Sequence, residues 1–199
     1  FSTMLRWDEP TLANIILHEM THATVYFKGE TDFNEQLATF IGNQGAIDFL
    51  TEKYGAGSKE VALAIHYQED DLLFGRWVDQ AYRQLSNFYE QPILREEKLR
   101  GRDGIFQSIR ESFGVIKDQF KTDCYKEVDQ IELNNAVVLA YRRYLHRLNR
   151  FETLHEHFGM DLRKMIEFFK EMKGSKEDTS SFIDRWMKER GVSIKKERK

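Results

Sequence analysis

The chain has 199 residues, of which 30 are basic and 33 acidic, and a net charge of -3 excludes the strongly basic surface typical of nucleic-acid binding. A 41% apolar content excludes a disordered chain. One cysteine, Cys124, excludes internal disulfides and multi-thiolate metal sites, and no run approaches the roughly 20 apolar residues that span a bilayer. Two prolines and 12 glycines favour long helices. We therefore predict a mainly α-helical protein, with residues 1–199 forming one domain.

The first predicted helix starts after Asp8, which can cap it, and runs to Lys28, where Gly29 follows as a stop signal. Its apolar residues form one stripe at helical spacing, and further apolar residues widen that stripe. We therefore expect a central, buried helix. The stripe comprises Leu12, Ile16, Met20, Ala23 and Phe27.

The rest of the chain also reads as helices, ended by glycine or by Pro92. A break near Gly101 and Gly104 is an alternative for one of them. The basic end of the chain, after Gly191, is interpreted as a solvated tail. No strand pattern is found. The expected helices span residues 32–54, 58–90, 93–120, 126–149, 161–173 and 178–190.

Residues 18–22 read HEMTH and match the pattern HExxH. Residues four apart lie on the same face of an α-helix, so the imidazoles of His18 and His22 point at one site and can bind one metal ion. Glu19 lies about 100° further round the helix, where it can hold a water molecule at the metal and take its proton. On an apolar helix these polar groups would carry a desolvation cost unless they were partnered. The pattern therefore favours a zinc site over two unrelated histidines.

A catalytic zinc site needs a third protein ligand. The extended metzincin pattern requires Gly and His at the positions that Val25 and Lys28 occupy, which excludes that class. Glu35 is the leading candidate, because a tight return past Gly29 can bring it over the two histidines. The alternative is that Glu35 closes a capping box with Asp32. Other candidates are His66, Asp48 and the acidic run 69–71. We interpret the acidic run as a solvated helix face.

The sequence HEMTH followed by NEQLATF resembles the gluzincin metallopeptidases, and the string LRWDEPTLANIILHEMTHATVYFKGETDFNEQLATFIG resembles the bacterial predicted-aminopeptidase family of that class. The resemblance extends to the run 134–136, to Tyr141 and Tyr144, and to the run 150–152. It implies a zinc-dependent peptidase with His18, His22 and Glu35 as ligands and Glu19 as general base.

The resemblance also bears on the fold and the location of the protein. It implies the helical catalytic domain of a gluzincin-like (zincin) peptidase, with any sheet largely in an N-terminal region that precedes this chain. Family members are typically longer at the N-terminus and some carry a lipoprotein-like signal. We therefore expect this chain to be the C-terminal part of a longer protein of the bacterial cell envelope.

A peptidase of this kind needs a group that stabilises the oxyanion formed at the scissile carbonyl. Tyr141 shares an otherwise apolar helix face with Asn134, and Tyr144 flanks that face. Both tyrosines are candidates for this role, and the alternative is that they pack in a helical core with their hydroxyls at its edge. His155 and His157 are splayed by their spacing, so we interpret them as a surface pair.

These observations predict a zinc-dependent metallopeptidase of aminopeptidase type that acts on peptides through a Zn²⁺-activated water, with Glu19 as general base. The alternative is a zinc-stabilised helical binding module without hydrolytic activity. The expected partner is a peptide substrate. Neither nucleic acid nor a transmembrane segment in this chain is expected.

Overall fold

The computed structural model describes residues 6–175 and 177–194, which form α-helices joined by turns and 3-10 helices, with no strand in these ranges. The prediction of a mainly α fold is confirmed. No helix within these ranges is both long and apolar enough to cross a membrane. The predicted tail at 195–199 lies outside the described residues.

The chain divides into two compact units. The first unit comprises Phe1–Ile65 and Arg147–Lys199, and the second comprises His66–His146. The expectation of one domain over residues 1–199 stays a prediction. The helices are α1 (Glu9–Thr24), α2 (Thr31–Tyr54), α3 (Lys59–Tyr89), α4 (Arg95–Ile116), α5 (Asn135–Leu145), α6 (Leu148–His157), α7 (Leu162–Met172) and α8 (Thr179–Glu189), with the 3-10 helices η2 (Lys117–Gln119) and η3 (Val128–Gln130).

Three predicted helices, over residues 9–28, 93–120 and 126–149, have different bounds in the structure. The first ends at Thr24 rather than Lys28, because Val25 turns the chain into extended backbone with φ -135° and ψ 120°. The second ends at Ile116, where the 3-10 helix η2 follows. The predicted helix over residues 126–149 is wrong. Asn134 caps a new helix by accepting a hydrogen bond from the backbone N–H of Val137, and Arg147, with a φ of 58°, separates α5 from α6. The helix near Gly101 and Gly104 is continuous.

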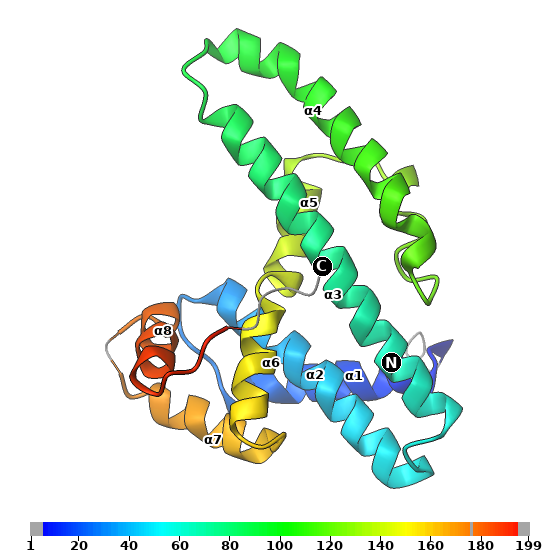
Figure 1. Cartoon of the computed structure of the whole chain (residues 1–199), viewed down its shortest axis with the longest axis vertical. Helices are drawn as coiled ribbons and strands as arrows, with labels where there is room; N and C mark the ends of the chain where they lie inside the picture. The colour runs from blue at the N-terminus through cyan, green and yellow to red at the C-terminus, as the bar shows by residue number, and fades with distance from the viewer. Residues whose placement is uncertain (1–5, 176, 195–199) are drawn as a thin grey trace. The chain divides into compact units, whose positions relative to one another are not determined.

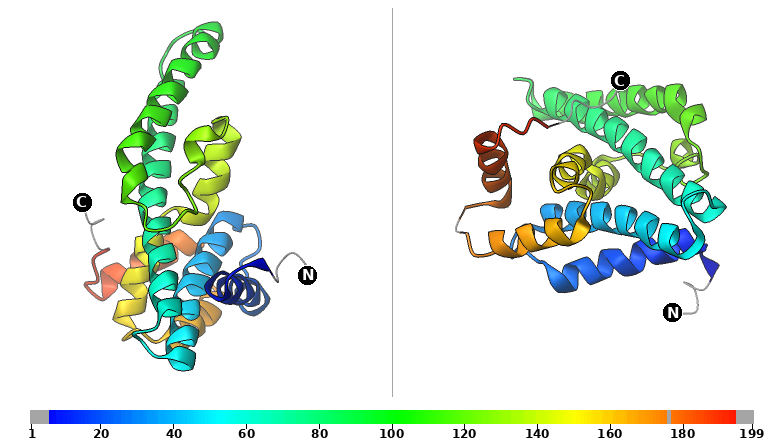
Figure 2. Two further views of the ribbon diagram at one scale, coloured as in Figure 1. Left: turned by 90° about the vertical axis from the view of Figure 1, so that its right-hand side faces the viewer. Right: turned by 60° about the horizontal axis from the view of Figure 1, so that its bottom comes forward.

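The first unit is built around α1 and α2, which lie side by side in Figures 1 and 2. On its other side α2 packs against α6 and α7 through phenylalanine rings. The ring centroid of Phe33 lies 5.6 Å from that of Phe151 and 5.9 Å from that of Phe169. Phe40 stacks on Phe151 at 5.9 Å. This aromatic packing fixes the face of α2 that is turned toward α6 and α7. The face of α2 that is turned toward α1 can therefore carry polar residues.

The expectation that α1 is buried and central is wrong. Its buried residues are only Pro10, Ala13 and Thr21, and the side chains of Ile16 and Met20 are 47% and 56% exposed. The reason is geometric, since α2 covers the face of α1 that carries His18, and Ile16 and Met20 lie on the opposite face.

His155 is also placed differently from its interpretation as a surface residue. It is only 2% exposed, and its ring lies 5.7 Å from that of Phe40. Burial lowers the pKa of His155, because the charged imidazolium would be desolvated there. This histidine is therefore a neutral core residue.

In the second unit, α4 runs back along α3 (Figure 1) and an aromatic core fills the unit. Phe74 is fully buried, and its ring stacks on Tyr125 at 4.1 Å. The interpretation of the acidic run 69–71 as a solvated face is wrong. Asp70 is 1% exposed and accepts hydrogen bonds from the backbone N–H groups of Lys121 (2.9 Å) and Thr122 (2.8 Å). This carboxylate holds the loop after α4 against α3.

Candidate metal centre

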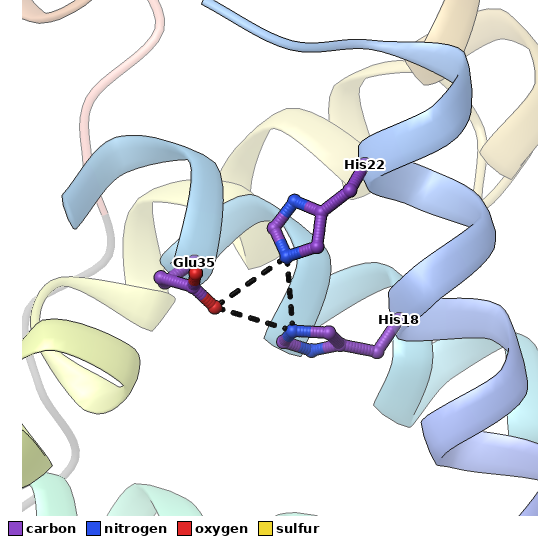
Figure 3. A group of neighbouring side chains, drawn as sticks. All are labelled: His18, His22 and Glu35. Carbon is purple, nitrogen blue, oxygen red and sulfur yellow. Dashed lines mark hydrogen bonds and ion pairs between the residues drawn. The ribbon is translucent and has the colours of Figure 1, made fainter. Parts of the chain in front are cut away.

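The structure brings together the side chains of His18, His22 and Glu35 (Figure 3). The histidines lie one turn apart on α1 and Glu35 lies near the start of α2. Nε2 of His18 is 3.2 Å from Nε2 of His22 and 3.3 Å from Oε2 of Glu35. Nε2 of His22 is 3.5 Å from the same oxygen. Two imidazole nitrogens and one carboxylate oxygen therefore converge on one point.

The spacing of these three atoms fits a zinc ion. Ligand atoms at the 2.0–2.2 Å bond lengths of a tetrahedral zinc site are separated by about 3.3–3.6 Å. A point equidistant from the three atoms lies about 1.9 Å from each, and a small displacement out of their plane lengthens the three distances to the bond lengths of zinc. The three residues are partly buried, and a fourth tetrahedral position would face away from their plane. Among the described residues, this is the one group of three potential ligands with such spacing.

The electrostatic surroundings of His18 favour its neutral form. Burial lowers the pKa of His18, and the neighbouring His22 lowers it further, while the carboxylate of Glu35 acts in the opposite direction. The net effect favours the neutral imidazole of His18 at neutral pH, and a neutral imidazole has one nitrogen with a lone pair available to a metal ion.

The chain reaches this arrangement through a tight turn between α1 and α2. The backbone N–H of Glu30 donates to the carbonyl of Phe27 at 3.2 Å. Gly29 has a φ of +87°, the conformation that the third position of a type II turn requires. Gly29 does not directly follow the first helix, which ends at Thr24, but it reverses the chain in the tight return that the sequence predicted. The reversal sets the start of α2 beside the histidines of α1.

Glu35 is not a capping residue. Helix α2 begins at Thr31, with Glu30 at its N-cap position, so Asp32 lies inside the first turn. Glu35 is the fifth helical residue and cannot close the box predicted with Asp32. Its carboxylate contacts His18 and His22 instead.

The other proposed ligands lie elsewhere. Asp48 is exposed and accepts a hydrogen bond from Gln44. His66 belongs to the second unit. Neither belongs to the group formed by His18, His22 and Glu35.

The residues predicted to act on the substrate lie outside the group formed by His18, His22 and Glu35. Glu19 follows His18 on α1, and its side chain is exposed, so it is accessible to water. Tyr141 and Tyr144 lie on α5, in the second unit. The ring of Tyr141 packs edge-on against Phe74 at 4.9 Å, and Tyr144 is 42% exposed. The role of these two tyrosines in catalysis stays a prediction.

Sequence reasoning missed two residues that shape the centre, Asn34 and Gly42. Gly42 lies on α2 opposite α1, and a Cβ atom added there would lie 2.9 Å from the carbonyl oxygen of Asn14 and 3.3 Å from Cβ of His18. The missing side chain lets the two helices approach at the turn that carries His18. A glycine in the interior of a helix is the signal that could have indicated this contact.

Replacing Gly42 with alanine is expected to push α2 away from α1. The opposing atom is a backbone oxygen, which cannot rotate away, so we expect a loss of about 1–3 kcal/mol in the free energy of unfolding and zinc binding weakened by about tenfold. Gly57→Ala is the matched control, because a Cβ there would meet no atom within 4 Å. Chemical denaturation and zinc titration measure both effects. Wild-type zinc affinity in Gly42→Ala would show that close helix approach does not set the centre.

Comparisons with known proteins add one positive finding. A search of curated proteins and a search of solved structures each found no match. A family model described as "Putative aminopeptidase" matches residues 1–181, which include both helices of the candidate metal centre. The chain belongs to this aminopeptidase family.

Proposed function

We propose that the protein is a zinc-dependent peptidase of aminopeptidase type, in which His18, His22 and Glu35 hold the metal. The observation that carries the proposal is the triangle of Nε2, Nε2 and Oε2 atoms, whose sides of 3.2, 3.3 and 3.5 Å match the edges of a tetrahedral zinc site. Membership of the aminopeptidase family supports the reaction class. Zinc bound there would lower the pKa of water and polarise the scissile carbonyl.

The protein's own residues would carry the proton transfers. The carboxylate of Glu19 would accept a proton from the attacking water and deliver it to the nitrogen of the leaving amine. Because Glu19 is exposed and adjacent in sequence to His18, water and a peptide can reach it without a change in the fold. Tyr141 and Tyr144 are the proposed hydroxyl donors to the oxyanion.

The proposal is tested with a panel of short peptides that have either a free or an acetylated N-terminus. Zinc-loaded protein is expected to release the N-terminal residue from the free peptides and to leave the acetylated peptides intact, because an aminopeptidase recognises the terminal ammonium. Metal-free protein should be inactive on both. Internal cleavage of acetylated peptides would replace the aminopeptidase assignment with an endopeptidase. Zinc binding without hydrolysis of any peptide would instead favour the zinc-stabilised binding module.

A further inference from the structure

The side chain of Asn34 forms hydrogen bonds with the return segment, residues 25–30, which joins α1 to α2. It is 2% exposed. Its Oδ1 accepts a hydrogen bond from the backbone N–H of Phe27 at 2.9 Å, and its Nδ2 donates to the carbonyl oxygen of Phe27 at 2.8 Å. One amide side chain thus bonds both backbone polar groups of a buried residue. The N–H of Phe27 would otherwise carry a desolvation cost, whereas its carbonyl also accepts from the N–H of Glu30.

The same segment has two further contacts, one at Phe27 and one at Glu30. The ring of Phe27 packs edge-on against Phe33 at a centroid distance of 5.3 Å. At the far end, the carboxylate of Glu30 accepts hydrogen bonds from Thr179 at the start of α8, one of them from its backbone N–H at 3.1 Å and the other from its hydroxyl. Because the segment is anchored at these points as well, loss of the Asn34 contact should loosen it without unfolding the unit.

Asn34 and Glu35 are consecutive residues on α2 and point in directions about 100° apart. The contact of Asn34 with Phe27 joins the first turns of α2 to the segment that follows α1. Those turns carry Glu35, whose Oε2 reaches His18 at 3.3 Å and His22 at 3.5 Å. A site of this kind tolerates displacements of only about 0.5 Å before its geometry is lost.

We propose that Asn34 is a positioning residue for the metal centre, which sets the reach of Glu35 toward His18 and His22 by clamping the backbone of Phe27. This inference rests on the proposed zinc site. The clamp needs an amide, which offers one acceptor and one donor. An aspartate of the same shape would keep the acceptor for the N–H of Phe27 but would place a second oxygen against its carbonyl.

The test compares Asn34→Asp and Asn34→Ala with the wild-type protein by zinc titration and by the visible absorption spectrum of the Co²⁺-substituted protein. Zinc affinity is expected to fall about 10- to 100-fold in both variants, the range for residues that orient metal ligands, and the Co²⁺ bands should shift as the carboxylate moves. In metal-free Asn34→Ala, the amide hydrogen of Phe27 should exchange faster with solvent. Asn34→Asp is the milder variant and keeps the test usable if Asn34→Ala fails to fold.

Met165→Ala is the matched control. Met165 is fully buried on α7 in the same unit, so its truncation should leave a cavity and lower the midpoint of chemical denaturation, while no residue of the return segment is changed. It should keep wild-type zinc affinity and the wild-type Co²⁺ spectrum. Equal losses in Met165→Ala would make the effect of Asn34 one of general stability and overturn the inference.

The result for the wild-type protein separates this inference from the proposed function. If the wild type binds zinc and both Asn34 variants keep its affinity within twofold and its Co²⁺ spectrum, the positioning role is overturned and the proposed function stands. If the wild type binds no zinc, the proposed function fails first and this inference fails with it.

Discussion

Replacing Glu35 with alanine is expected to weaken zinc binding more than about 100-fold, because changes to residues that only orient metal ligands already cost 10- to 100-fold. The substitution removes the one carboxylate oxygen that contacts both His18 and His22. Two imidazoles alone would leave the ion short of protein ligands. Competition with a chromogenic chelator measures the affinity directly.

The matched control for this variant is Glu52→Ala. Glu52 is an exposed acidic residue on the same helix, α2, and lies outside the group of potential ligands. Its replacement should leave zinc affinity unchanged. If Glu35→Ala binds zinc as tightly as Glu52→Ala does, a different residue supplies the third ligand.

Replacing Glu19 with glutamine is expected to keep zinc bound and to lower kcat by about 10²- to 10⁴-fold, the usual contribution of a general base. Glutamine has the size of glutamate but cannot accept a proton at neutral pH. Zinc stoichiometry and kcat should be measured on the same preparation, so that a loss of metal is not mistaken for a loss of the base.

Glu9→Gln serves as the control on the same helix. Glu9 lies in the first turn of α1 and pairs with Lys53 at the surface, so its neutralisation should leave both zinc content and kcat unchanged. A Glu19→Gln variant with wild-type kcat would remove Glu19 from the reaction. A variant that loses zinc would indicate that Glu19 supports the metal rather than the proton transfer.

The candidate metal centre could be predicted in large part from local sequence. The spacing of His18 and His22 alone places both imidazoles on one helix face, and Gly29 indicated the turn that brings Glu35 back. The sequence left two roles open for Glu35, because the choice depended on where α2 begins. Its start at Thr31 rather than after Asp32 excludes the capping role.

Other features depend on contacts between residues far apart in the chain, which a local pattern does not contain. The apolar pattern of the first helix continues to Phe27, yet the helix ends at Thr24, and Phe27 lies in the return segment, where its backbone is hydrogen-bonded to the distant Asn34. Asp70 looks like part of a solvated run until the loop at Lys121 and Thr122 closes over it. Periodicity identifies helices well, but it does not show which face is covered.

The central claim is that one zinc ion, held by His18, His22 and Glu35, makes this protein a peptidase. Its most direct test is a titration of metal-free wild-type protein with zinc while the release of the N-terminal residue from a peptide is followed. Activity is expected to rise in proportion to added zinc and to reach its plateau at one equivalent. Full activity before any zinc is added, or one tightly bound equivalent that produces no hydrolysis, would contradict the central claim.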